Sequence, residues 1–273
     1  MTGETMVPAN GVDLCVETFG EGSDPPVLLI GGGASSMDWW DDEFCRRLAA
    51  GGRLVIRYDH RDTGRSTAFP PGAPPYSQVD LADDALGLLD ALGERRAHLV
   101  GMSLGGWLAQ RIAVDHPSRP LSLTLISTTP APAGGGPDPG DQPDPFDWSD
   151  RKAAVDRLIT ESRQLGGPFT ADEPQLRRLA ERVFDRSTDL NASVTNHWLA
   201  PAGPPIRERL GAVTVPTVVM HGTVDSMFGM DQAEALVREI PGARLVKLEG
   251  VGHEFPPPAV WNQVIGEILK HTA

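Results

Sequence analysis

The chain has only two cysteines among its 273 residues, Cys15 and Cys45. Two thiols are too few for the disulfide framework of a small secreted domain, so we expect a reduced, cytoplasmic setting. The sequence also lacks an apolar run close to the roughly 20 residues that span a bilayer. Its first residues show neither the basic nor the apolar region of a signal peptide.

Positive charge is scarce as well. The chain contains 24 lysines and arginines against 37 aspartates and glutamates, which gives a formal net charge of -13. This balance argues against nucleic acid and anionic membranes as partners. The histidines and cysteines show no spacing typical of metal ligands, so we expect no metal and no cofactor. A monomer and a homodimer are both compatible with the sequence.

What the sequence does contain is an alternation of apolar, strand-like runs with helical periods. Buried-strand patterns occur over residues 26–30, 53–58, 98–102, 121–126, 215–221 and 244–248. Helical patterns separate these runs and also follow the last of them. The order predicts an α/β fold with a mostly parallel, doubly wound sheet.

Two further elements are expected at the ends of the chain. Residues 5–19 predict a β-hairpin, with Asn10 and Gly11 as its turn. A final helix is expected over residues 258–271. Both would complete the same α/β core.

The alternation is interrupted between residues 130 and 212. The first part, through residue 145, is rich in proline and glycine, and we expect a linker there. From about residue 148 to 209 the apolar spacing is helical, and no strand pattern occurs. We therefore predict a helical cap over 130–212, inserted into a core formed by 1–129 and 213–273.

A Gly-x-Ser-x-Gly motif over residues 101–105 lies between a predicted strand and a predicted helix. This is the sequence form of a nucleophile elbow, in which a tight turn exposes the serine hydroxyl, here of Ser103. Glycines two residues before and after the serine remove Cβ atoms that would clash in so sharp a turn. The motif alone is also compatible with an ordinary helix start in which Ser103 is a cap.

A serine nucleophile needs a base, and the base needs a group that orients it. Asp225 follows the strand over 215–221, and His253 follows the strand over 244–248. Catalytic groups of α/β sheets gather at the carboxyl ends of strands. The chain order Ser103, Asp225, His253 is the order expected for a nucleophile elbow, so we predict that these residues form a catalytic triad.

Acyl transfer also needs hydrogen-bond donors for the oxyanion of the tetrahedral intermediate. The backbone amide of Leu104, directly after Ser103, is one candidate. The glycine run after the strand over 26–30 supplies the other, and Gly33 is our choice within that run. The alternative is that this run is a flexible turn.

The residues named above resemble the α/β-hydrolase superfamily, over nearly the whole chain outside the cap. The loop over 59–66 is similar to the family's Asp-x-Arg-Gly-x-Gly-x-Ser, and Gly250-Val251-Gly252-His253 matches the family's histidine loop. The run from Val55 to Thr67 looks more narrowly like the aclacinomycin methylesterase group, which acts on aromatic polyketides. That resemblance implies the same triad, and Gly33 as the second oxyanion donor. A departure is Gly31, which stands where the family's oxyanion loop usually has histidine.

We therefore expect a cofactor-independent serine hydrolase that cleaves a carboxylic ester, and a methyl ester if the narrower resemblance holds. Lactonases, C–C bond hydrolases and perhydrolases use the same triad, and a non-catalytic binding protein could keep the fold. Haloalkane dehalogenases and epoxide hydrolases are disfavoured, because they resemble this fold but have aspartate in place of Ser103. Five apolar residues are candidates for contacts to a hydrophobic small-molecule ester: Trp40, Trp198, Met227, Phe228 and Phe255.

Overall fold

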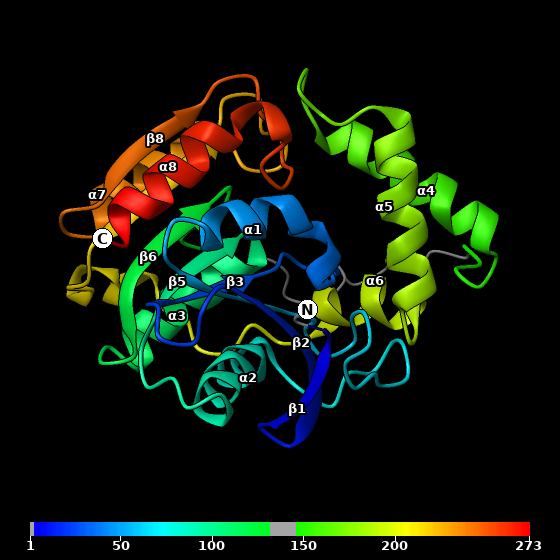
Figure 1. Cartoon of the computed structure of the whole chain (residues 1–273), viewed down its shortest axis with the longest axis horizontal. Helices are drawn as coiled ribbons and strands as arrows, with labels where there is room; N and C mark the ends of the chain where they lie inside the picture. The colour runs from blue at the N-terminus through cyan, green and yellow to red at the C-terminus, as the bar shows by residue number, and fades with distance from the viewer. Residues whose placement is uncertain (1–2, 132–145) are drawn as a thin grey trace.

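The computed structural model of the chain describes residues 3–131 and 146–273. Its centre is an eight-stranded sheet in the order β1-β2-β4-β3-β5-β6-β7-β8 (Figure 1). β1 and β2 pair with each other in antiparallel fashion, as do β2 and β4, whereas every other neighbouring pair is parallel. The strands are β1 (Thr5–Ala9), β2 (Val12–Phe19), β3 (Pro26–Ile30), β4 (Leu54–Tyr58), β5 (Ala97–Met102), β6 (Pro120–Ile126), β7 (Thr217–Gly222) and β8 (Arg244–Leu248).

Helices cover both faces of this sheet. The α-helices are α1 (Asp42–Ala49), α2 (Gln78–Ala91), α3 (Leu104–Asp115), α4 (Arg151–Leu165), α5 (Glu173–Arg186), α6 (Leu190–Leu199), α7 (Met230–Glu239) and α8 (Trp261–His271). The apolar residues of α1 and α8 share one core cluster, and those of α2, α3 and α7 share the other. The predicted doubly wound α/β sheet is therefore confirmed.

The alternation of side chains along β3 explains why this strand reads as a continuous apolar run. Val27 and Leu29 lie in the cluster with α1 and α8, whereas Leu28 and Ile30 lie in the cluster with α2 and α3. All four side chains are fully buried. A parallel strand with helices on both faces needs apolar residues at every position, because neither face meets water.

The predicted hairpin and the predicted last helix agree with the structure to different degrees. The hairpin of β1 and β2 turns at Asn10 and Gly11, both with positive φ, as a two-residue hairpin turn requires. The predicted helix over 258–271 is divided into a 3-10 turn (Pro258–Val260) and α8. The first turn is tighter because the Val260 N–H donates to the Pro257 carbonyl, three residues back.

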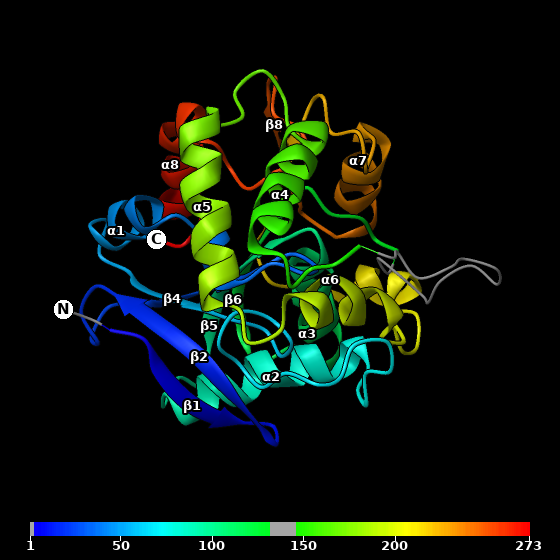
Figure 2. The same cartoon turned by 90° about the vertical axis from the view of Figure 1, so that its right-hand side faces the viewer.

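Between β6 and β7 the described residues form α4, α5, α6 and a 3-10 helix (Arg207–Ala212), without a strand. α4 and α5 pack as a pair in front of the sheet in the view of Figure 2. They share an apolar cluster of their own, which includes Val155, Leu158 and Val183. The expected linker over 130–145 lies almost wholly outside the described residues. The division of the chain into core and cap thus stays a prediction.

Buried polar contacts attach these helices to the rest of the chain. Arg186, at the end of α5, contacts the carboxylates of Glu4, Asp38 and Asp59. Asn196, in α6, donates to Asp62 Oδ2 at 2.9 Å. Charged groups that lose water are stable only when they are paired, so these contacts fix the helices at specific places. Among the described residues, no helix is both long and apolar enough to cross a membrane.

The loop after β4, residues 59–66, is held by a buried ion pair. Arg61 Nε lies 2.6 Å from Asp84 Oδ2 in α2, and its second contact reaches the other carboxylate oxygen. The two side chains are 6% and 0% exposed. Removing one partner of such a pair leaves an uncompensated charge in the interior.

We therefore expect Asp84→Ala to lower the free energy of unfolding by about 3–5 kcal/mol. Urea denaturation followed by circular dichroism measures this change. The matched control is Asp185→Ala, which removes the partner of Arg151 in a surface pair where both side chains are about half exposed. Exposed pairs contribute little, so the control should unfold like the parent. Equal losses in both variants would contradict the assigned role of Asp84.

Candidate active site

Ser103 occupies the single-residue turn between β5 and α3. Its backbone has a positive φ of 52° with ψ -117°, a conformation that non-glycine residues rarely adopt. A Cβ at Gly101 would overlap the backbone of Gly105, and a Cβ at Gly105 would overlap the carbonyl of Ile30. The Gly-x-Ser-x-Gly motif thus has a steric cause, because three backbone segments meet there.

Ser103, His253 and Asp225 form a hydrogen-bonded series. His253 Nε2 lies 3.0 Å from Ser103 Oγ, and His253 Nδ1 lies 2.9 Å from Asp225 Oδ2. Ser103 is 6% exposed and His253 is 8% exposed. Three residues separated by up to 150 positions therefore lie together, in the arrangement that activates a serine hydroxyl.

The environment of Asp225 keeps its carboxylate charged. Oδ1 accepts hydrogen bonds from the amides of Met227 at 2.9 Å and Phe228 at 2.8 Å. Burial acts to raise the pKa of Asp225, but the hydrogen bond and charge of His253 outweigh it, and the pKa lies below its ordinary value. An ionised Asp225 can accept a hydrogen bond from the Nδ1–H of His253 and so fix that tautomer.

Neighbouring segments hold His253 and Asp225 in position. The His253 amide donates to the carbonyl of Leu165, the last residue of α4, at 2.7 Å. The ring of Phe228 meets the His253 imidazole edge-on, with centroids 5.1 Å apart. His221 Nε2 lies 2.8 Å from the Phe228 carbonyl, and this hydrogen bond holds the loop that contains Asp225.

The glycine run after β3 lies against Ser103. A Cβ built on Gly32 would lie 3.6 Å from Ser103 Cβ, and one built on Gly33 would lie 2.7 Å from the ring of Trp198. Among the described residues no acceptor is found for the Gly33 N–H. Leu104 is the first residue of α3, so its amide has no acceptor within the helix.

The five apolar candidates for substrate contact differ in their surroundings. Trp198 and Met227 are 37% and 44% exposed, and Phe228 lies beside His253. Phe255 packs against Trp40, with ring centroids 4.9 Å apart. Trp40 is only 1% exposed and belongs to the core cluster of α1 and α8, so in this conformation it has no surface for a substrate. Apolar character alone does not distinguish a core residue such as Trp40 from a residue beside the predicted triad such as Phe228.

Two buried histidines lie beside the glycine run, and the sequence patterns assign a role to neither. His60 Nε2 lies 3.1 Å from the Gly31 carbonyl, and His197 Nδ1 lies 3.1 Å from the Ala34 amide. Burial lowers the pKa of His60 to about 3 and also lowers the pKa of His197. No local pattern marks either residue, because their partners come from distant elements.

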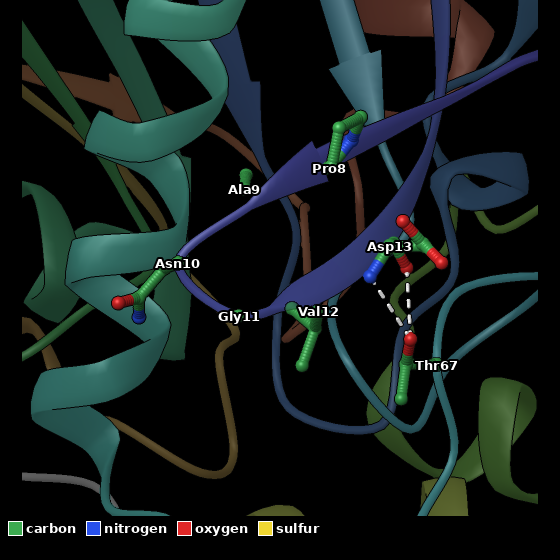
Figure 3. A pocket seen from close by; sticks show the side chains of 7 residues that line it. All are labelled: Pro8, Ala9, Asn10, Gly11, Val12, Asp13 and Thr67. Carbon is green, nitrogen blue, oxygen red and sulfur yellow. Dashed lines mark hydrogen bonds between the residues drawn. The ribbon is translucent and has the colours of Figure 1, made fainter.

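A hollow of about 430 Å³ lies on the β1–β2 hairpin, away from these residues. Figure 3 shows its lining, in which the Asp13 backbone and Thr67 are hydrogen-bonded. It contains none of the predicted site residues. No group of three or more His, Cys, Asp or Glu side chains in residues 3–131 and 146–273 is arranged to hold a metal ion.

Comparison with known proteins identifies the family of the chain. Residues 25–257 match the family described as the alpha/beta hydrolase fold. The chain is 34% identical to a rhodomycin D methylesterase of Streptomyces sp. (strain C5), over 98% of this chain and 97% of the relative. The identity is 35%, with the same coverage, for a rhodomycin D methylesterase of Streptomyces peucetius.

A solved hydrolase structure has a similar fold. The crystal structure of a hydrolase from Pseudomonas aeruginosa PA01 matches with a TM-score of 0.77 and 27% identity, and 98% of each chain is covered. The sharp turn at Ser103 between β5 and α3 has the strand-to-helix form described for this fold. This chain belongs to the α/β-hydrolase family, and it is a hydrolase.

Proposed function

We propose that the chain is a cofactor-independent serine hydrolase of carboxylic esters, in which Ser103 is the nucleophile, His253 the base and Asp225 the orienting acid. The observation that carries this proposal is the pair of hydrogen bonds from Ser103 to His253 and from His253 to Asp225. The strained, positive-φ turn at Ser103 supports it, because such a turn directs a nucleophilic hydroxyl away from the sheet.

In the first half of the reaction, His253 Nε2 takes the proton of Ser103 Oγ as the oxygen attacks the acyl carbon. The ester carbonyl oxygen becomes negatively charged, and the amides of Leu104 and Gly33 are the proposed donors that stabilise it. Asp225 stabilises the imidazolium that forms. His253 then protonates the leaving alcohol oxygen, and the acyl group stays on Ser103.

In the second half, His253 removes a proton from water as the water oxygen attacks the acyl-enzyme. The tetrahedral intermediate collapses, Ser103 Oγ leaves and regains its proton from His253, and the carboxylic acid is released. Each proton moves through the same nitrogen, so the distance between His253 Nε2 and Ser103 Oγ governs both halves.

For the substrate class, we infer a methyl ester of a hydrophobic small molecule. The support is twofold: the two Streptomyces relatives are named methylesterases, and exposed apolar side chains lie near the site. Trp198 covers Gly33, and Phe228 borders His253. Aromatic surfaces of this kind suit a flat, apolar acyl group.

Replacing Ser103 tests the proposed nucleophile. Ser103→Ala removes the attacking oxygen, and we expect kcat for p-nitrophenyl acetate to fall by about 10⁵-fold or more. The parent should be labelled on Ser103 by a fluorophosphonate and should turn over the ester, whereas the variant should do neither. Mass spectrometry of the labelled peptide and stopped-flow kinetics measure both.

The control is Ser118→Ala, at an exposed serine in the turn between α3 and β6. It should keep the parent's kcat and labelling. Hydrolysis that persists in Ser103→Ala would show that Ser103 is not the nucleophile. Labelling of the parent without turnover would indicate a binding protein that keeps the triad.

Replacing Trp198 tests the proposed contact with the acyl group. Trp198→Ala should raise KM for a methyl ester of a polycyclic aromatic acid by about 3- to 10-fold, because ring contacts of this kind contribute about 0.5–1.5 kcal/mol. KM for p-nitrophenyl acetate should change little. Steady-state kinetics on both esters measure the difference.

The matched control is Phe169→Ala, which removes an aromatic ring that is similarly exposed, on the loop between α4 and α5. It should leave both KM values unchanged. If Trp198→Ala leaves KM for the polycyclic ester unchanged, Trp198 does not contact the acyl group. Cleavage of lactones or aryl diketones in preference to methyl esters would overturn the proposed substrate class.

A further inference from the structure

We propose that His197, in α6, is a positioning residue that holds the Gly33 amide in place for the oxyanion. It acts through the backbone of the next residue, Ala34. This inference rests on the proposed function, since it assumes that Gly33 donates to the oxyanion. It adds a residue that the triad and the two amides do not include.

The peptide unit between Gly33 and Ala34 is held at both of its polar atoms. The Ala34 N–H donates to His197 Nδ1 at 3.1 Å, and the Gly33 carbonyl accepts from Ser35 Oγ at 3.3 Å. Ala34 has a φ of 59°, a conformation that a non-glycine residue adopts only when its surroundings enforce it. The hydrogen bond to His197 is the contact that fixes this conformation.

Two further carbonyls of the loop are also held by hydrogen-bonding partners. The Gly31 carbonyl lies 3.1 Å from His60 Nε2, and the Gly32 carbonyl accepts from the Ser35 amide at 3.2 Å. The Gly33 N–H is left without an acceptor in the described residues. A donor that is free while its surroundings are fixed is what a preorganised oxyanion site requires.

The second nitrogen of His197 determines which atom can accept. His197 Nε2 lies 2.8 Å from the Arg61 carbonyl, and a carbonyl can only accept, so Nε2 has the proton. Nδ1 therefore has a lone pair for Ala34. Arg61 is itself fixed by the ion pair with Asp84, so the orientation of the ring follows from a rigid partner.

The surroundings of His197 keep the ring neutral, which acceptance at Nδ1 requires. Burial lowers its pKa, and although the Arg61 carbonyl and the charge of Asp62 act in the opposite direction, the pKa stays below its ordinary value. The guanidinium of Arg61 opposes protonation too, and the His60 ring lies edge-on at 5.6 Å. Imidazole in this place is a permanent acceptor at neutral pH.

His197 belongs to the helical segment between β6 and β7, not to the sheet that carries Ser103. Trp198, the next residue of α6, packs on Gly33 from the same helix. One turn of α6 thus contacts two consecutive residues of this loop, Gly33 and Ala34. Through this turn, the position of α6 affects the rate of the chemical step as well as the binding of substrate.

Two substitutions at His197 separate the proposed role from simple packing. Asn places its Oδ1 near the position of Nδ1 and can still accept from Ala34, whereas Gln places its amide near Nε2 and can still donate to Arg61. We expect His197→Gln to lower kcat for p-nitrophenyl acetate by about 10- to 100-fold, because loss of an oxyanion donor altogether costs 10²–10³-fold. KM should change less than threefold. His197→Asn should stay within about fivefold of the parent's kcat, the margin left for imperfect replacement of the acceptor.

The control is His98→Gln, at a histidine of β5 whose Nδ1 contacts Ser122 on the neighbouring strand. It should keep the parent's kcat and KM. If His197→Gln and His197→Asn lose kcat equally, or if neither loses it, the positioning role is wrong. Ser103→Ala is measured in the same series: activity that survives in it refutes the proposed function, whereas an inactive Ser103→Ala with unaffected His197 variants refutes this inference alone.

A measurement on the parent protein covers the case in which the His197 variants do not fold. In ¹⁵N-labelled protein, the His197 Nδ1 resonance should have the shift of an unprotonated nitrogen that accepts a hydrogen bond, and Nε2 that of a protonated one. The Ala34 amide should exchange slowly with solvent. A protonated Nδ1, or a rapidly exchanging Ala34 amide, would overturn the proposal.

Discussion

The close approach of three backbone segments at Ser103 is the constraint on which the site depends. β5, the start of α3 and the end of β3 meet where only glycine fits at positions 101 and 105. The same close approach that accompanies the positive-φ turn at Ser103 brings the run after Ile30 beside it. The proposed nucleophile and the proposed oxyanion donors are therefore set by one packing arrangement, and a shift in one moves the other.

The helical segment between β6 and β7 takes part in this arrangement. Its buried Arg186 pairs with carboxylates of the core, and its Leu165 carbonyl accepts from the His253 amide. Breaking a buried ion pair leaves an uncompensated charge, so these contacts resist displacement of the segment. The placement of this segment thus affects the position of His253, the proposed base.

Sequence patterns were sufficient for the sheet and for the residues at its carboxyl edge. Ser103, Asp225 and His253 each follow a recognisable strand, and parallel strands end on one side of a sheet, so their proximity follows from local signals. His197 has no such signal, since α6 is positioned by side chains such as Asp62 from a distant loop. Trp40 is apolar, as a residue that contacts a hydrophobic substrate would be. Its side chain is buried because α1 and α8 pack over it, and no local sequence pattern indicates that packing.

A consequence concerns how this fold can change its substrate. Exposed side chains such as Trp198 can vary without loss of a polar contact, and they are the natural positions for new specificity. His197 and Leu165 cannot vary as freely, because each supplies an acceptor to the backbone of the proposed machinery. Leu165 acts through its carbonyl, so its side chain is free to change while its place at the end of α4 is not. Selection for a new substrate would then act on the surface of the segment while its contacts to Ala34 and His253 stay fixed.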